Sequence, residues 1–322
     1  MSDSVTYAGI DIGGTSIKYG LVDSQGKILF KKQRPTVVDK GAEPLIHLVT
    51  NIAEGLMYHA AEEDHDVRWL GVGTPGAVDA RSGTVIGSAP NIDGWQGMAI
   101  GSVLGERLNM PVHVDNDVNA MALAESRFGA GVGYDSIVCV AVGTGVGGGI
   151  VLNGKLWRGA NHTAGEIGHI VIDPNGPECR CGNRGCVEAF CSSAAIIARV
   201  RKKLGGKLTP AFENVLRGNV ANLNIRKLFE AAKKGDKTAI EVIDETAEYL
   251  ASGLASVVNL FNPEIVIIGG GVADAGSSFV TAVSAGIRRR ANSSATEKLR
   301  VARATLGNSA GFVGAGILGE TR

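Results

Sequence analysis

The chain has 322 residues, of which 44% are hydrophobic and 46 are glycine, and its basic and acidic residues balance at 32 each. This length can bury one large core or, as we expect, two domains. Because a balanced charge leaves no basic excess, we expect neither a nucleic-acid partner nor a membrane-surface partner. No apolar run reaches membrane-spanning length and the start lacks the pattern of a signal peptide, so we expect a soluble cytoplasmic protein.

The first segment, Val5 to Gln33, is typical of antiparallel hairpins. The short runs YAGIDI, SIKYGLVD and KILFKK are separated by a Gly13-Gly14-Thr15 turn and a Ser24-Gln25-Gly26 turn. Apolar residues at helical spacing then predict a helix from about Glu43 to Glu63. Further along we expect a strand at 68–73, a helix near 99–108, a strand at 112–117 and a helix from 118 to about 127.

Residues 136–157 repeat the pattern of the opening segment. SIVCVAV leads into the turn Gly143-Thr144-Gly145, and GGGIVL, an Asn153-Gly154 turn and KLW follow. The repetition predicts two domains built on one plan and facing each other across a cleft. We place the first domain at residues 1–117 plus 305–322 and the second, larger one at 118–304.

A zinc site is predicted by four residues in the second half of the chain. Cys179, Cys181 and Cys186 supply three sulfurs and His169 an imidazole, which is the ligand set of a closed tetrahedral site with no place for substrate. Such a metal is structural. A disulfide or a set of inert buried thiols is the alternative, which suits a cytosolic chain less well. Cys191 stays an alternative to His169 as the fourth ligand.

The remaining part of the chain predicts mainly helices. One covers Ile225–Lys234, and another is capped by Asp236 and runs to Asn262. The strand EIVIIGG follows and ends in three glycines, Gly269 to Gly271. The tail, ATLGNSAGFVGAGIL, predicts a loop and then a helix of small residues.

The glycine turns are candidates for binding phosphate. No G-x4-G-K-[ST] motif occurs, which excludes a P-loop nucleotidase of that type. Gly143, Gly145 and Gly148 match a dinucleotide-binding pattern by letter, but a strand follows where a Rossmann turn must open a helix. We therefore expect two opposed hairpin turns, Gly13–Thr15 and Gly143–Gly145, to bind phosphate oxygens through backbone N–H groups and threonine hydroxyls.

Two aspartates beside these turns are candidates for chemistry. Asp11 ends a buried strand, where a magnesium ion would offset its charge, although it could instead cap the turn. Asp117 stands where a strand ends and a helix begins. It could be a simple helix cap, with Asp115 nearby, or a general base for a substrate hydroxyl.

Taken together, these motifs resemble the sugar kinases of the ROK (repressor, ORF, kinase) family, and among them the bacterial ATP-dependent glucokinases. The resemblance covers nearly the whole chain and is specific as an ordered set. Its motifs are DIGGTSIK at 11–18, GTPGAV at 73–78, PNIDGW at 90–95, DND at 115–117, GTGVGGG at 143–149, AGEIGH at 164–169, the zinc segment to Glu188 and IVIIGGG at 265–271.

The resemblance implies an α/β protein of the actin-like ATPase (ribonuclease-H-like) fold, with two domains and an interdomain cleft. It implies phosphorylation of glucose at the 6-hydroxyl, with Asp117 as the general base, magnesium near Asp11 and adenosine near Gly269–Gly271. The implied sugar ligands are Gly76, Asn91, Asn116, Asp117, Glu166, His169 and Glu188. The implied nucleotide ligands are Asp11, Gly13, Gly14, Thr15, Lys18, Gly143, Thr144, Gly145, Gly269, Gly270 and Gly271.

Several alternatives stay open from the sequence. N-acetylglucosamine, N-acetylmannosamine, fructose and mannose kinases share these motifs, and polyphosphate could replace ATP as the donor. Glu166 and Glu188 could be ordinary solvated carboxylates. A non-catalytic sugar-binding regulator is disfavoured, because the first phosphate motif begins at Asp11 and leaves no room for a preceding helix-turn-helix domain. The resemblance also implies a homodimer or homotetramer.

Overall fold

The structure is a computed structural model that describes residues 5–37, 40–87, 89 and 91–321. Pro90 of the PNIDGW motif and the first four residues, on which the prediction of no signal peptide partly rests, lie outside this set. The chain divides into two compact units, one of Met1–Ile137, Gly149–Gly165 and Thr305–Arg322 and one of Val138–Gly148 and Glu166–Ala304. The domain boundary that we placed after residue 117 lies within the first of these units and stays a prediction.

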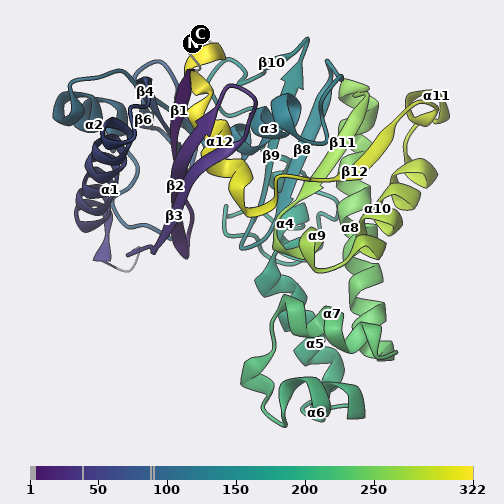
Figure 1. Cartoon of the computed structure of the whole chain (residues 1–322). Coiled ribbons are helices and arrows are strands. Elements are labelled where there is room, and N and C mark those ends of the chain that lie inside the picture. The colour runs from purple at the N-terminus through teal and green to yellow at the C-terminus, as the bar shows by residue number, and fades with distance from the viewer. Residues whose placement is uncertain (1–4, 38–39, 88, 90, 322) are drawn as a thin grey trace. The chain divides into compact units, whose positions relative to one another are not determined.

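The first unit is built on a five-stranded sheet with the order β3-β2-β1-β4-β7 (Figure 1). Its strands are β1 (Thr6–Ile12), β2 (Ser16–Asp23), β3 (Ile28–Pro35), β4 (Val67–Thr74) and β7 (Val112–Asn116). The first three pair in antiparallel fashion, whereas β1, β4 and β7 run parallel. The carboxyl ends of these parallel strands therefore meet at one edge of the sheet, where Asp11 and Asp115 each pair in register with Gly73.

Helices cover both faces of this sheet (Figure 1). Apolar residues of α1 (Ala42–Glu62) and α2 (Ile100–Leu108) form one core with residues of β1, β2, β4 and β7. On the other face lie α3 (Asp117–Phe128) and α12 (Ala310–Gly316), which share a smaller cluster with Val22. A small hairpin of β5 (Val78–Asp79) and β6 (Thr84–Val85) completes this part of the chain.

The small residues of α12 and of the sheet have a packing role. A Cβ added to Gly9 would lie 1.8 Å from the carbonyl oxygen of Phe312, and one added to Gly71 would lie 1.7 Å from that of Ala315. Atoms cannot approach so closely, so only glycine lets α12 lie directly on β1 and β4. The fully buried carboxylate of Glu125 accepts hydrogen bonds from the backbone N–H groups of Thr305 (2.9 Å) and Leu306 (2.8 Å) and so holds the segment that precedes α12.

The second sheet has the order β10-β9-β8-β11-β12. Its strands are β8 (Ile137–Val142), β9 (Val146–Leu152), β10 (Lys155–Leu156), β11 (Ile265–Gly269) and β12 (Arg300–Arg303). In both sheets the order is third, second, first, fourth and fifth strand, which confirms the prediction of two halves built on one plan. The α/β class is confirmed as well.

The second unit holds most of the remaining helices. They are α4 (Val187–Cys191), α5 (Ser193–Leu204), α6 (Pro210–Leu216), α7 (Ile225–Lys233), α8 (Lys237–Phe261), α9 (Gly271–Ala275), α10 (Ser277–Arg290) and α11 (Ser293–Thr296). The long helix α8 begins at the predicted cap, where the Asp236 carboxylate accepts a hydrogen bond of 2.8 Å from the Ala239 N–H. Its apolar face packs into the core of this unit with β8 and β11. Short 3-10 turns occur at Ile167–His169, Val220–Asn222, Gly307–Ser309 and Leu318–Thr321.

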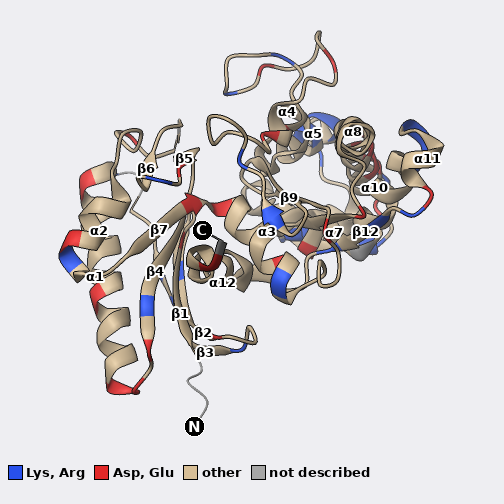
Figure 2. Cartoon of the chain, turned by 90° about the horizontal axis from the view of Figure 1, so that it is seen from above, with Lys and Arg blue, Asp and Glu red and all other residues tan. Residues whose placement is uncertain are grey.

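Helices of both units carry acidic as well as basic residues (Figure 2). Nε of Arg107 in α2 lies 2.5 Å from a carboxylate oxygen of Glu54 in α1, and a guanidinium nitrogen of Arg290 in α10 lies 2.5 Å from one of Glu248 in α8. These ion pairs are consistent with the equal numbers of basic and acidic residues in the sequence. Among the described residues, no helix combines the length and the apolar character that crossing a membrane requires.

Candidate functional site

The turn between β7 and α3 presents Asp117 at the start of a helix. The cap of this helix is Asn116, because its side-chain oxygen accepts hydrogen bonds from the N–H groups of Val118 (2.9 Å) and Asn119 (3.3 Å). The interpretation of Asp117 as the cap is therefore wrong. Asp117 is the first helical residue, and its partly buried carboxylate accepts a bond of 2.9 Å from the Val118 N–H.

Asn116 also connects the turn to a second predicted sugar ligand. Its side-chain amide donates a hydrogen bond of 3.1 Å to the carbonyl oxygen of Gly76. Gly76 has a φ of 88°, a left-handed conformation that favours glycine. Asn91 instead lies exposed on the loop that ends at Trp95, and this loop is anchored by a bond of 2.9 Å from the Trp95 indole to the Thr74 hydroxyl.

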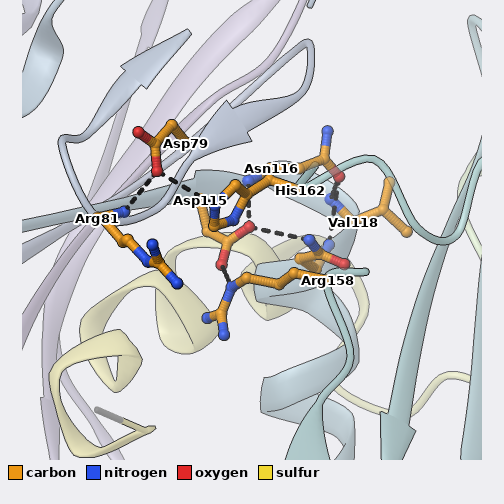
Figure 3. Close-up of polar contacts among 8 residues, drawn as sticks. Asp79, Arg81, Asp115, Asn116, Val118, Arg158 and His162 are labelled. Atoms are coloured by element: carbon orange, nitrogen blue, oxygen red, sulfur yellow. Dashed lines mark hydrogen bonds and ion pairs between the residues drawn. The ribbon is translucent and has the colours of Figure 1, made fainter. Parts of the chain in front are cut away.

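Asp115, one residue before the cap, is buried and fully engaged (Figure 3). One of its carboxylate oxygens accepts hydrogen bonds from the Asn116 N–H at 2.8 Å and the Asn119 amide at 2.9 Å. The other lies 2.6 Å from Nε of Arg158, which follows β10. The motif DND therefore divides its work, since Asp115 braces the turn, Asn116 caps the helix, and Asp117 is its first residue.

Asp11 ends β1 in the same unit and is also mostly buried. Lys18, its register partner on β2, places its Nζ 4.0 Å from the Asp11 carboxylate. Gly311 of α12 approaches so closely that an added Cβ would lie 2.4 Å from the Asp11 carboxyl carbon. Burial raises the pKa of Asp11 to about 6, although the charge of Lys18 acts in the opposite direction.

The two carboxylates influence each other. Burial raises the pKa of Asp117 to about 7, and the negative charge of Asp11 contributes to the same shift. A carboxylate with a pKa near neutrality is well matched to accept a proton from a hydroxyl. A mostly buried carboxylate whose cation lies 4.0 Å away also fits a hard, oxygen-seeking ion such as magnesium.

Each predicted phosphate loop contains one glycine with open space around its backbone, although Gly13, Gly145 and Gly270 are closely approached by other atoms. Added Cβ atoms at Gly14, Gly143 and Gly271 would meet no atom within 4 Å, and the side chains of Thr15 and Thr144 are exposed. These are features that a phosphate-binding loop needs. Gly13–Thr15 belongs to the first unit, whereas Gly143–Gly145 and Gly269–Gly271 belong to the second.

Within the second unit the two glycine loops are held at the ends of neighbouring strands. Gly270 has a φ of 86°, and a Cβ there would lie 2.4 Å from the Val142 carbonyl oxygen at the end of β8. The Ser193 N–H donates a bond of 2.8 Å to the Gly143 carbonyl oxygen. Gly269 therefore ends β11, Gly270 lies beside Val142, which precedes the Gly143–Gly145 loop, and Gly271 begins α9.

The four residues predicted to bind zinc are gathered in one cluster. His169, Cys179, Cys181 and Cys186 offer ligand atoms that all lie within 4.8 Å of one another. The sulfurs of Cys181 and Cys186 are 3.7 Å apart, too far for a disulfide bond. A tetrahedron with metal–sulfur distances of about 2.3 Å has sulfur–sulfur edges of about 3.8 Å, so the cluster fits zinc. Cys191 donates instead to the Thr246 carbonyl oxygen at 3.6 Å and is not part of it.

Three predicted sugar ligands lie around this cluster. Nδ1 of His169 is 3.7 Å from the Cys179 sulfur, while its Nε2 is 3.8 Å from a carboxylate oxygen of Glu166. Glu188 accepts a hydrogen bond of 2.9 Å from the Val146 N–H, which places it against the Gly143–Gly145 loop. Burial raises the pKa of Glu166, which the His169 charge opposes and Glu188 reinforces. The Glu166 side chain is 54% exposed, so the alternative of an ordinary solvated carboxylate stays open for it, and the sugar-binding roles of Glu166 and Glu188 stay predictions.

Sequence reasoning missed Arg158, Asp79 and His162. Nε2 of His162 lies 3.2 Å from Asp79, whose carboxylate also accepts from the Arg81 N–H at 3.0 Å (Figure 3). These hydrogen bonds, with a contribution from His162, lower the pKa of Asp79. The signal in the sequence that pointed to a partner such as Arg158 was Asp115, because an aspartate at the end of a buried strand requires a cationic partner.

The comparisons with known proteins agree with this arrangement. Residues 7–322 match the model of the ROK family. The chain belongs to the ROK family. A glucokinase of Thermotoga maritima is 39% identical over 268 residues, which are 83% of this chain and 82% of that protein. A xylose repressor of Caldicellulosiruptor bescii is 33% identical over 282 residues, which are 88% of this chain and 70% of the repressor.

A solved structure supports the fold of this ROK chain. A ROK family glucokinase from Streptomyces griseus, in complex with glucose and AMPPNP, is 37% identical and superposes with a TM-score of 0.85. The match covers 97% of this chain and 98% of that one. The actin-like ATPase fold that the sequence resemblance implied is thereby confirmed.

The raised pKa of Asp117 predicts a pH-dependent effect on stability. The carboxyl titrates near 7 in the folded chain and near 3.8 when unperturbed, so its ionisation costs stability as pH rises between these values. Asp117→Asn removes this cost. We expect the unliganded variant to gain about 1–3 kcal/mol over the parent at about pH 8 and to show little gain at about pH 4.

The measurement is chemical denaturation at both pH values. Asp93→Asn, the same replacement at an exposed aspartate, serves as the matched control and should change stability little at either pH. An Asp117→Asn variant whose stability relative to the parent is the same at both pH values would contradict the assigned pKa.

Proposed function

We propose that this hexokinase-type sugar kinase transfers the γ-phosphate of ATP to the 6-hydroxyl of glucose. The Asp117 carboxylate takes the hydroxyl proton while the sugar oxygen forms its bond to the γ-phosphorus. The bond from that phosphorus to the oxygen bridging to the β-phosphate breaks, and ADP leaves with the electron pair. The observation that carries the proposal is a carboxylate with a pKa of about 7 on a braced turn, beside a second buried carboxylate.

For ATP and Mg²⁺ we propose ligands from both units. Asp11 and the Gly13–Thr15 turn would face the phosphates, and Lys18 would add a positive charge near them. The open loops Gly143–Gly145 and Gly269–Gly271 would bind the rest of the nucleotide. Bound Mg²⁺ supplies neutralisation of phosphate charge, which phosphoryl transfer requires more than covalent help from the protein.

The sugar ligands would be carboxylates and amides. Asn116 is fixed by Gly76 and by its capping bonds, and Asp117 follows it directly. Glu166, Nε2 of His169 and Glu188, which lie near one another in the second unit, would bind further hydroxyls. Donors and acceptors of this kind, once covered by a bound sugar, reject a sugar whose hydroxyls leave them unpaired. Asn91 stays a predicted ligand.

Glucose is proposed as the substrate, and ATP as the donor, on the strength of the relatives. The Thermotoga maritima relative is named a glucokinase, and the Streptomyces griseus structure holds glucose and AMPPNP. A sugar-binding regulator is the second candidate, because the xylose repressor of Caldicellulosiruptor bescii matches over most of this chain. The predicted cytoplasmic location and homo-oligomeric state stay predictions.

The proposal is tested by initial rates of MgATP-dependent phosphorylation with glucose, mannose, fructose, N-acetylglucosamine and N-acetylmannosamine. We expect kcat/KM for glucose to exceed the others by about tenfold or more. Asp117→Asn should lose at least about 10²-fold in kcat while sugar affinity, measured calorimetrically, changes little. A preference for an acetylated sugar would show that glucose is not the substrate. Sugar binding without turnover of any sugar would favour the second candidate, a sugar-binding regulator.

Zinc in the cysteine cluster would order the sugar ligands beside it. His169 would bind zinc through Nδ1 and the sugar through Nε2, since these atoms face the Cys179 sulfur and Glu166 respectively. Cys181→Ser is expected to lose the metal and to raise KM for glucose about 10-fold or more. Metal content per chain, determined by mass spectrometry, and KM are the two readouts.

Cys139→Ser provides the matched control for the zinc experiment. Cys139 is a buried cysteine of β8 that is not a member of the metal cluster, so this variant should keep the metal content of the parent. A metal-free Cys181→Ser variant with the KM of the parent would show that zinc does not order the sugar site.

A further inference from the structure

The segment from Trp157 to Gly165 connects β10 to Glu166. It contacts other parts of the first unit, to which it belongs, at two points (Figure 3). Arg158 binds Asp115 at one end, and His162 lies 3.2 Å from Asp79 near the other. The segment also closes on itself, since the Ala164 N–H donates a bond of 3.0 Å to the Arg158 carbonyl oxygen. These contacts lie within one unit and do not involve the proposed reacting groups directly.

The bond between Arg158 and Asp115 differs from the surface ion pairs of this chain. The side chain of Arg158 is 18% exposed and that of Asp115 only 2%, whereas Arg68 and Asp66 are 57% and 63% exposed. A buried carboxylate is stable in its charged form only with a cation and hydrogen bonds around it. Removing one partner of such a pair leaves the charge of the other buried and uncompensated. Removing one partner of a surface pair does not, because water solvates the remaining charge.

We propose that Arg158 is a positioning residue for Asp117, acting through Asp115 and the cap of α3. Arg158 pairs with the buried Asp115 carboxylate and holds it in place, and Asp115 in turn holds the Asn116 N–H and the Asn119 side chain. Asn116 caps the helix whose first residue is Asp117. The inference rests on the proposed role of Asp117 as the base.

Removal of Arg158 should therefore act on the reaction step more than on sugar binding. In Arg158→Met the buried Asp115 carboxylate is left without its cation, so it braces the turn less firmly. The chemical step slows strongly when the base moves by even a fraction of its distance from the hydroxyl whose proton it accepts. We expect kcat to fall on the order of 10- to 100-fold, with KM for glucose changed by less than about threefold.

The experiment compares the parent with Arg158→Met, Arg158→Lys and Arg68→Met. Steady-state rates are measured as a function of pH, and amide hydrogen exchange is followed by mass spectrometry over residues 116–119. For Arg158→Met we expect faster exchange in this segment together with the fall in kcat. Arg158→Lys keeps the positive charge and should recover part of both effects, and Arg68→Met, at an exposed pair, should match the parent.

Three results would overturn the inference. A folded Arg158→Met variant with the kcat, pH profile and hydrogen exchange of the parent would remove any positioning role. A lower melting temperature with unchanged kcat would leave Arg158 a purely structural residue. A raised KM for glucose with unchanged kcat would make it a direct sugar ligand instead.

Two further provisions keep the test decisive. If Arg158→Met does not fold, Arg158→Lys is compared with Arg68→Lys, and unchanged exchange and kcat in the former would contradict the inference. If the parent phosphorylates no sugar, the proposed function fails, while hydrogen exchange at 116–119 still reports whether Arg158 holds the turn.

Discussion

Burial of carboxylates at the ends of parallel strands is the constraint on which this structure depends. Asp11 at the end of β1 and Asp115 at the end of β7 both align with Gly73 of β4, so their side chains come from one edge of one sheet. The negative charge of each carboxylate must be compensated, and the chain compensates Asp11 and Asp115 differently. Asp115 receives a close guanidinium and two hydrogen-bond donors, whereas the Lys18 ammonium lies 4.0 Å from the Asp11 carboxylate.

This difference separates structural from chemical roles. Asp115 suits bracing, because both of its carboxylate oxygens are held by Arg158, the Asn116 N–H and the Asn119 amide. Asp11 and Asp117 are compensated incompletely, and their pKa values rise to about 6 and about 7. Keeping these two carboxylates ionised lowers the stability of the fold. The same incomplete compensation makes Asp117 a usable base and Asp11 a suitable neighbour for a cation.

Much of the fold could be predicted because its signals are local. The glycine turns, the alternating strands, the Asp236 cap and the cysteine spacing each involve residues close together in sequence. The contact between Arg158 and Asp115 joins residues 43 apart, and no periodicity or motif reports it. The identity of the α3 cap was also out of reach, because Asn116 and Asp117 are both good capping residues and only the backbone geometry decides between them.

The central claim is that Asp117 acts as a base whose pKa is raised by burial. The most direct measurement is the pH dependence of kcat/KM for glucose at subsaturating MgATP. The account predicts that kcat/KM rises with pH along an ionisation near 7 and levels off above it, because only the ionised carboxylate accepts the proton. A profile that stays flat from about pH 5.5 to about pH 8 would contradict the account.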